Sequence, residues 1–340
     1  MRAFRVHQHG GPEVLKEEVL PDPSPAADEV IVEVKACALN HLDLWVRKGV
    51  PGHKFPLPII PGCDIAGVVK EAGAVVKNAK PGDKVVVSPG FGCDACESCA
   101  EGNDNLCREY GIMGETRDGG YAQYVRVPAR LLLPLPDGLS FETAAAAPLT
   151  MLTAWHMLIG RCGLRAGDDV LVHAAGSGVG SAAVQIAKLH GARVWATAST
   201  EAKRAKAVEL GADAAFGYEN FVEEVRKRTS KRGCDIVFEH VGTATFEGSL
   251  KCVAKGGRVV TCGATTGADA KFDLRLVFFK SLSILGSTMG SRGELMRAMR
   301  LVGQGKLKPV VDRVMPLAEV RKAHEMLEKR EQFGKIVLVP

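Results

Sequence analysis

The chain is 340 residues long, which suggests about two domains at roughly 150 residues each. Apolar residues make up 46% and charged residues 24%, an ordinary balance for a globular protein with buried cores. The formal charge of +5 is not gathered into a basic block, which argues against nucleic-acid binding. No apolar run approaches the ~18 residues that cross a membrane, and no secretory signal opens the chain, so we expect a cytoplasmic protein.

The first part of the chain is predicted to consist of short strands and turns. Residues 29–34 alternate apolar and polar side chains, and residues 84–88 form a short apolar run, as strands do. Turns are marked by Pro-Gly pairs at 51–52, 61–62 and 81–82. This pattern favours a small antiparallel barrel or sandwich.

After about residue 139 the pattern changes to alternating strands and helices. An Ala-rich helix is predicted over 141–158, with an interruption at Pro148. Short apolar strands then alternate with helices, which predicts βαβ units and a parallel sheet. The expected strands are 169–174, 193–198, 235–240, 257–262 and 282–287, and the expected helices are 180–190, 201–210, 222–229, 245–253 and 293–304. A helix at 319–329 and a last strand at 335–340, returning to the first domain, are expected in the tail.

A dinucleotide site is predicted where strand 169–174 runs into a glycine-rich turn and a helix. Glycines let backbone N–H groups approach a pyrophosphate, and a helix N-terminus adds positive potential. The turn departs from the strict G-x-G-x-x-G pattern, so a tight turn in another α/β protein is the alternative. Its place at the first strand of the series favours the dinucleotide. The expected binding residues are Gly176, Ser177, Gly178, Val179 and Gly180.

The end of the second expected strand bears on the choice between NADPH and NADH. A carboxylate there binds the ribose hydroxyls, whereas a 2′-phosphate needs small polar groups and a cation. No carboxylate follows strand 193–198 before Glu201, so the sequence favours NADPH, with NADH possible. The alternative is a capped helix with a solvated basic face. The residues concerned are Ser199, Thr200, Lys203 and Arg204.

Four of the ten cysteines lie close together on one loop: Cys93, Cys96, Cys99 and Cys107. Four thiolates on a short loop are typical of a closed structural zinc site. A redox pair needs only two cysteines, and iron–sulfur clusters usually show other spacings, so zinc is favoured over both. The six scattered cysteines are expected to be buried and reduced rather than paired in disulfides.

Together these features resemble the medium-chain dehydrogenase/reductase superfamily over nearly the whole chain. The cysteine loop is similar to the structural-zinc loop of its zinc alcohol dehydrogenases. Residues 173–200 and the segment around 39–49 are more similar to its quinone oxidoreductase branch. The resemblance implies an α/β protein with a GroES-like β-barrel catalytic domain and a Rossmann doubly wound parallel sheet. The implied boundaries are 1–145 and 290–340 for the first, with the zinc lobe at about 90–110, and 146–289 for the second.

The catalytic-zinc ligands of those alcohol dehydrogenases are not matched. Asn40 stands where they place a cysteine, Cys63 stands where they place a histidine, and their third ligand has no counterpart. A catalytic zinc needs about three protein ligands, so we expect none here. The alternative is an improvised set of Cys37, Cys63, and Asp64 or His41.

Without a Lewis acid, an unactivated ketone or alcohol is harder to polarise. A C=C bond conjugated to a carbonyl still accepts hydride when that carbonyl is only hydrogen-bonded. We therefore expect an NADPH-dependent reductase of activated C=C bonds in a small molecule: an enoyl thioester such as an enoyl-CoA, a quinone or an enal. The alternatives are a zinc alcohol dehydrogenase with atypical catalytic-metal ligands and a non-catalytic NADPH-binding protein.

The resemblance also assigns residues by position. Asn40 and Thr153 are expected against the nicotinamide and the substrate. His41 and Asp43 are the candidate proton donors; structural roles for both, or protonation by solvent, are the alternatives. A homodimer paired through the strand near 282–287 is implied as well. Further cofactor contacts are expected from His240, Val241, Gly242, Gly263, Ser287, Thr288 and Met289.

Overall fold

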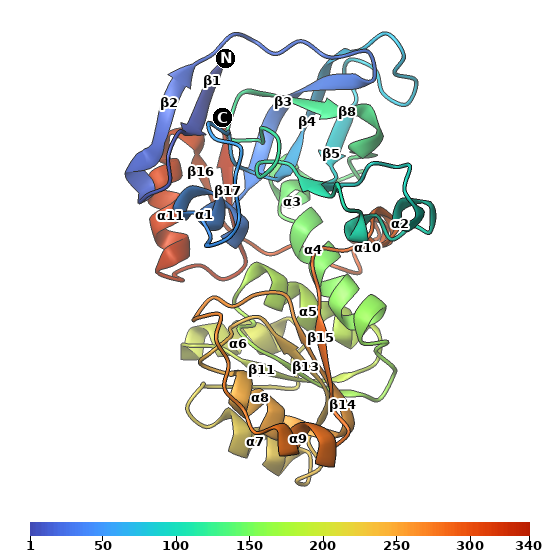
Figure 1. Cartoon of the computed structure of the whole chain (residues 1–340), viewed down its shortest axis with the longest axis vertical. Coiled ribbons are helices and arrows are strands. Elements are labelled where there is room, and N and C mark those ends of the chain that lie inside the picture. The colour runs from blue at the N-terminus through green and yellow to red at the C-terminus, as the bar shows by residue number, and fades with distance from the viewer. The chain divides into compact units, whose positions relative to one another are not determined.

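The computed structural model describes residues 1–340 and divides them into two compact units (Figure 1). Unit 1 comprises residues 1–149, 291–304 and 309–340, and unit 2 comprises residues 150–290 and 305–308. None of the helices is both long enough and apolar enough to cross a bilayer.

Unit 1 is built around a seven-stranded sheet whose central strand is β3 (Glu29–Ala38). One side of β3 pairs antiparallel with β4 (Asp64–Ala72), and the other with β8 (Tyr124–Pro128) and β17 (Lys335–Val339). The tail therefore returns to the first unit, as the sequence predicts. The other strands are β1 (Arg2–Val6), β2 (Leu15–Val19), β5 (Lys84–Val87), β6 (Gly90–Phe91), β7 (Gly111–Ile112), β9 (Leu132–Pro134) and β16 (Val311–Pro316). The helices are α1 (His41–Lys48), α2 (Glu97–Ala100), α3 (Phe141–Ala145), α10 (Arg292–Gly303) and α11 (Val320–Glu328).

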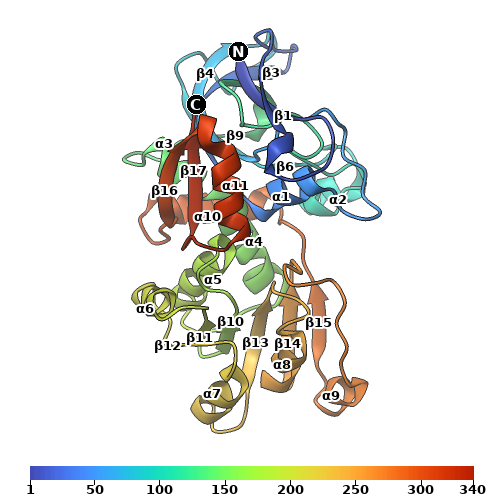
Figure 2. The same cartoon turned by 90° about the vertical axis from the view of Figure 1, so that its left-hand side faces the viewer.

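Unit 2 is a six-stranded parallel sheet in the order β12-β11-β10-β13-β14-β15 (Figure 2). Five of its strands are those the sequence predicts. The sixth, β12, was missed because its three residues carry too short an apolar pattern. The strands are β10 (Asp169–Val172), β11 (Arg193–Thr197), β12 (Ala214–Phe216), β13 (Cys234–Glu239), β14 (Val253–Thr261) and β15 (Ser283–Gly286).

Helices cover this sheet in two groups. α5 (Gly178–Leu189) and α6 (Glu201–Glu209) pack on β10, β11 and β12, whereas α8 (Phe246–Cys252) packs on β13 and β14, with α7 (Phe221–Arg228) beside it. From β10 the chain continues to β11 and β12 on one side of the sheet and then to β13, β14 and β15 on the other. Right-handed crossovers therefore place the two groups of helices on opposite faces of the sheet. The remaining helices are α4 (Pro148–Trp155), which continues as a π-helical segment (His156–Arg161), and α9 (Leu274–Phe279).

The direction of chain progression in unit 2 reverses between β10 and β13. In doubly wound sheets, ligands bind outside the carboxyl ends of the strands at this point of reversal. The fold therefore places a binding edge at the residues that follow β10, β11 and β13.

Candidate functional site

The glycine-rich turn connects β10 to α5 at this edge. The helix begins at Gly178, two residues before the predicted start, because the Ser177 Oγ accepts the Gly180 N–H at 2.9 Å and caps the helix. A Cβ on Gly180 would lie 2.3 Å from the Ala174 carbonyl oxygen, so only glycine allows this approach. The turn thus presents the N-terminus of a twelve-residue helix, which fits a pyrophosphate.

Two buried hydroxyl oxygens of unit 2 have no hydrogen-bond partner within the protein. They are the Oγ1 of Thr153 on α4 and the Oγ of Ser287 after β15. A buried polar atom without a partner is costly, so both hydroxyls are available to hydrogen-bond a ligand. The family resemblance places both residues at the nicotinamide half of the cofactor, whose ribose and carboxamide offer suitable partners. Unit 2 therefore fits NAD(P).

The polar residues after β11 occupy the start of α6. The Thr200 Oγ1 accepts the Lys203 N–H at 3.2 Å, so the capping role left open in the sequence is present. The Arg204 Nη1 lies 3.4 Å from the Ala198 carbonyl oxygen, which turns this guanidinium toward the strand end. Ser199 and Thr200 are exposed. The segment combines hydroxyls with a cation and has no carboxylate before Glu201.

The remaining cofactor candidates also follow strands. His240, Val241 and Gly242 come after β13, Gly263 follows β14, and residues 287–289 follow β15. The predicted cofactor residues of unit 2, apart from Thr153, thus lie in the loops and first helical turns that follow the strands of one sheet.

In unit 1, buried polar side chains converge around Asn40. Its amide nitrogen lies 2.9 Å from the Asp64 Oδ2 and 3.4 Å from the Cys63 Sγ. The Lys335 Nζ donates to the Asn40 Oδ1 at 2.5 Å and to the Asp64 Oδ2 at 3.0 Å. Sequence reasoning missed Lys335, which lies 271 residues from Asp64 and reaches it only because β17 pairs with β3.

This arrangement does not fit a catalytic zinc. Of the converging groups only Cys63 and Asp64 are usual zinc ligands, and Asp64 is already paired with the ammonium of Lys335. Burial, reinforced by neighbouring carboxylates, raises the pKa of the Cys63 and Cys37 thiols well above their ordinary value. The ammonium of Lys335 lies against Asn40 and Asp64 at this position.

Asp43 joins the two segments that carry Asn40 and Cys63. Its carboxylate accepts the N–H groups of Asn40 at 2.7 Å and Gly62 at 3.1 Å. Burial raises the pKa of Asp43 to about 6, although the hydrogen bond from the Asn40 N–H and the charge of Lys335 oppose the shift. Asp43 therefore has a structural role, because it holds the segments of Asn40 and Gly62 together. His41, the first residue of α1, is half-buried.

A row of completely buried side chains extends from Asp43 into the interior of unit 1. Tyr121 lies beside Asp43, and its hydroxyl lies 3.2 Å from the His324 Nε2. The Arg47 Nη1 lies 3.4 Å from the His324 Nδ1. Burial, with help from Arg47, lowers the pKa of His324 to about 3, so this histidine is neutral. No local motif marks Tyr121 or His324, because they come from distant parts of the chain.

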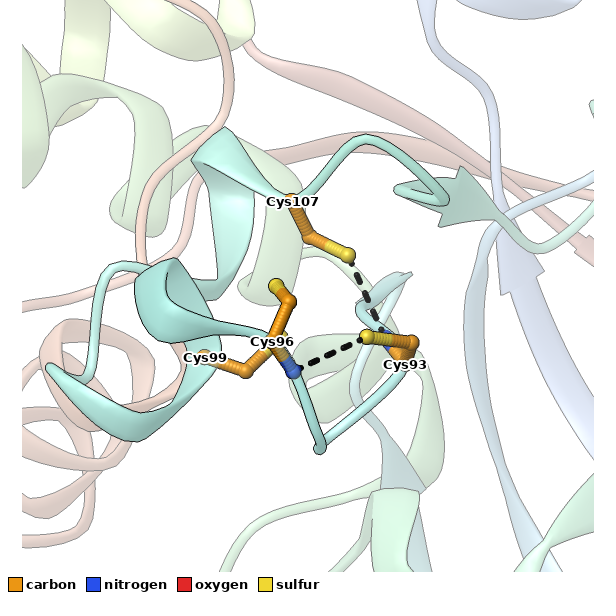
Figure 3. A group of neighbouring side chains, drawn as sticks. All are labelled: Cys93, Cys96, Cys99 and Cys107. Atoms are coloured by element: carbon orange, nitrogen blue, oxygen red, sulfur yellow. Dashed lines mark hydrogen bonds between the residues drawn. The ribbon is translucent and has the colours of Figure 1, made fainter.

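The four cysteines predicted to bind zinc point toward one another (Figure 3). Their sulfur atoms all lie within 4.8 Å of each other. Backbone N–H groups face two of these sulfurs: Cys96 N lies 3.4 Å from the Cys93 Sγ, and Cys93 N lies 3.4 Å from the Cys107 Sγ. Such N–H groups lower the pKa of Cys93 to about 7. The lobe fits a closed tetrahedral zinc site, and all ten cysteines are free of disulfides.

Comparison with known proteins identifies the family. The model of the alcohol dehydrogenase GroES-like domain matches residues 26–137, and that of the zinc-binding dehydrogenase matches residues 178–304. Human (Homo sapiens) quinone oxidoreductase is 31% identical, over 100% of this chain and 98% of its own length. The chain belongs to the medium-chain dehydrogenase/reductase superfamily. Its fold and its NAD(P)-dependent oxidoreductase class are therefore as expected from the sequence.

Other members of the superfamily differ in reaction. A crotonyl-CoA carboxylase/reductase of Cereibacter sphaeroides is 34% identical, over 97% of this chain and 84% of its own length. The solved structure of an NAD-dependent alcohol dehydrogenase is 51% identical, with a TM-score of 0.97 and complete coverage of both chains. This higher identity favours the alcohol dehydrogenase alternative over the reduction of C=C bonds that we expect from the sequence.

Proposed function

We propose that this superfamily member is an NAD(P)-dependent dehydrogenase that interconverts an alcohol and its carbonyl compound. The observation that carries the proposal is the 51% identity, over the complete chain, with an NAD-dependent alcohol dehydrogenase. In the oxidative direction the carbinol carbon loses hydride to the nicotinamide and the hydroxyl loses a proton. The products are the carbonyl compound, NAD(P)H and one proton.

In this proposal Lys335, oriented by Asn40 and Asp64, holds the substrate oxygen. An ammonium group has three N–H donors, and Lys335 gives two of them to Asn40 and Asp64. The third polarises the substrate oxygen, on which negative charge develops as hydride is transferred. Asp64 keeps the ammonium in place, and Asp43 fixes the backbone of Asn40. The bound nicotinamide supplies or accepts the hydride.

A second candidate is reduction of a C=C bond conjugated to a carbonyl. It is favoured by the side chains around Asn40, because they include fewer than the three ligands that a catalytic zinc needs. Two of these side chains, Asn40 and Asp64, already bind the ammonium of Lys335. The oxygen of an enal, a quinone or an enoyl thioester can be held by the same hydrogen bonds while hydride adds to the β-carbon.

One substrate separates the two reactions. An enal such as cinnamaldehyde carries both groups, so it is incubated with NADPH deuterated at the transferred position. Carbonyl reduction yields the unsaturated alcohol with deuterium on the carbinol carbon, which supports the proposal. Deuterium on the β-carbon of the saturated aldehyde overturns it in favour of the second candidate. Tight NADPH binding with no turnover of alcohols, aldehydes, quinones or enoyl thioesters supports a non-catalytic binding protein.

Metal content tests the remaining alternative, an alcohol dehydrogenase with atypical zinc ligands. We expect one zinc per chain, held by the four-cysteine lobe. A second zinc, lost together with activity when Cys63 is replaced by serine, would show that Lys335 does not take the place of the metal.

We further propose NADPH as the cofactor and a homodimer as the assembly. The hydroxyls and cations at the start of α6 support the first. The second is supported by β15, an edge strand of the sheet on which Ile284 is 40% exposed. α9, which directly precedes β15 in the chain, exposes Phe278 and Phe279 to 61% and 71%. Exposed apolar groups of this size mark interaction surfaces.

A further inference from the structure

Unit 2 contains a buried polar cluster that none of the roles above uses. We call it the Glu239 hub: it comprises Glu239, His173, Thr197, Thr245 and Ser249. Thr245 is 2% exposed and the other four side chains are completely buried. Five polar side chains in a sheet core have to satisfy one another, so their arrangement is tightly specified.

The Glu239 carboxylate shapes the loop that follows β13. Its Oε1 accepts the N–H groups of Val241 at 2.6 Å and Gly242 at 3.1 Å. Its Oε2 accepts the hydroxyls of Thr245 at 2.8 Å and Ser249 at 2.7 Å. One carboxylate therefore ties the loop to α8. Val241 and Gly242 are among the residues predicted to contact the cofactor.

From Glu239 the hub continues to the neighbouring strands through a series of hydrogen bonds in which each group donates toward Glu239. Because Ser249 donates its proton to Glu239, its oxygen accepts from the His173 Nε2 at 3.0 Å. The His173 Nδ1 then accepts the Thr197 hydroxyl at 3.0 Å, and the Thr197 oxygen accepts the Ala174 N–H at 3.1 Å. The network thus assigns the Nε2–H tautomer to His173. Burial lowers the pKa of His173 to about 4, in agreement with a neutral ring.

The hub joins the ends of three strands at the binding edge. His173 follows β10 and precedes the glycine-rich turn, Thr197 ends β11 before Ser199, and Glu239 ends β13. His240 adds a further link, since its Nε2 lies 2.8 Å from the His173 carbonyl oxygen. These are the loops expected to contact the pyrophosphate, the adenosine ribose and the adenosine half of the dinucleotide.

We propose that Glu239 is a positioning residue for the dinucleotide, fixing these three loops through the hub before the cofactor binds. The inference rests on the proposed NAD(P) dependence and not on which substrate is reduced. A preformed site does not have to order its loops when the ligand arrives, and this raises affinity. A purely structural role would stabilise unit 2 without changing affinity for the cofactor.

Unit 2 offers a matched control at the opposite end of the same sheet. Asp169, at the amino end of β10, is also a completely buried carboxylate. It accepts hydrogen bonds from the Trp195 Nε1 at 3.2 Å, the Arg193 Nη2 at 2.7 Å and the Arg232 Nη2 at 2.6 Å. Because it lies away from the binding edge, Asp169→Asn is expected to lower the melting temperature and leave cofactor affinity unchanged.

The test measures the Kd of NADPH and of NADH by nucleotide fluorescence, together with the melting temperature of each variant. Glu239→Ala leaves the N–H groups of Val241 and Gly242 without their acceptor, so we expect Kd to rise about tenfold or more. Glu239→Gln keeps one oxygen for those groups, and the hydroxyls and the imidazole can reverse their hydrogen bonds. We therefore expect its Kd to stay within about threefold of wild type.

Two results overturn the proposal: Glu239→Ala lowering the melting temperature with an unchanged Kd, or Glu239→Gln weakening binding as much as Glu239→Ala. If Glu239→Ala does not fold, Ser249→Ala is used, which cuts the hub between Glu239 and His173. It is expected to raise Kd at least about threefold, and an unchanged Kd again overturns the proposal. A wild-type protein that binds neither nucleotide refutes the NAD(P) dependence itself.

Discussion

Replacing Lys335 by methionine tests the electrostatics of the Asn40 cluster, because the variant keeps the aliphatic stem and deletes the charge. Asp64 is completely buried, Lys335 is 4% exposed, and their charged atoms lie 3.0 Å apart. Removing one partner of a buried ion pair costs about 3–5 kcal/mol, since the other charge stays buried and uncompensated. Asp64 keeps the hydrogen bonds from the Asn40 amide and the Leu149 N–H, so we expect the lower end, about 3 kcal/mol.

Urea unfolding, followed by circular dichroism for Lys335→Met, Asp64→Asn and the double variant, measures this cost. The double variant carries neither charge, and we expect it to recover most of the stability that Lys335→Met loses. It should nevertheless remain inactive, since the proposed donor to the substrate oxygen is missing. A Lys335→Met variant within about 1 kcal/mol of wild type, or a double variant whose loss equals the sum of the single losses, would refute the reasoning.

Four further outcomes are expected. Cys107→Ser should reduce zinc from one per chain to none and lower the melting temperature; elemental analysis that still finds a full equivalent would contradict the assigned ligand set. Replacing both Lys203 and Arg204 by alanine should weaken NADPH binding about tenfold and leave NADH binding nearly unchanged, and equal losses for the two nucleotides would argue against a 2′-phosphate site. Ile284→Arg should convert the proposed dimer to a monomer, as judged by the molar mass from light scattering. A wild-type protein that is already monomeric would contradict this prediction. Because the pKa of His324 lies at about 3 in the folded state and about 6.5 in the unfolded state, its contribution to stability is complete above pH 6.5 and is lost as pH falls toward 3. Urea titrations of His324→Gln should therefore show a slope of stability against pH that is shallower than wild type by up to about 1.4 kcal/mol per unit below pH 6.5, and parallel slopes would contradict the burial of a neutral ring.

Features encoded within one short segment could be predicted from the sequence. The strand, glycine-rich turn and helix around Gly180 follow one another along the chain, and the four cysteines lie on a single loop. Their residue types, spacing and order carry the whole signal. The start of α5 was still misplaced by two residues, because the cap at Ser177 depends on the conformation of the turn.

Features assembled from distant segments could not be predicted in this way. Lys335 meets Asp64 through strand pairing, and Glu239 meets His173 through the packing of α8 on the sheet. Nothing in the sequence next to these residues shows that they are buried together. The expected reduction of C=C bonds rested on missing zinc ligands, and the sequence did not reveal that Lys335 pairs with Asp64 beside Asn40.

The return of β17 to β3 has a consequence for how the protein is made. Unit 1 is interrupted by unit 2, and its last strand carries the ammonium that pairs with Asp64. On the ribosome, residues 150–290 therefore emerge and can complete their sheet while the earlier unit still lacks an edge partner and a counter-charge. Until residue 335 has left the exit tunnel, Asn40 and Asp64 lack their partner Lys335, so the unit translated first is the last to be completed.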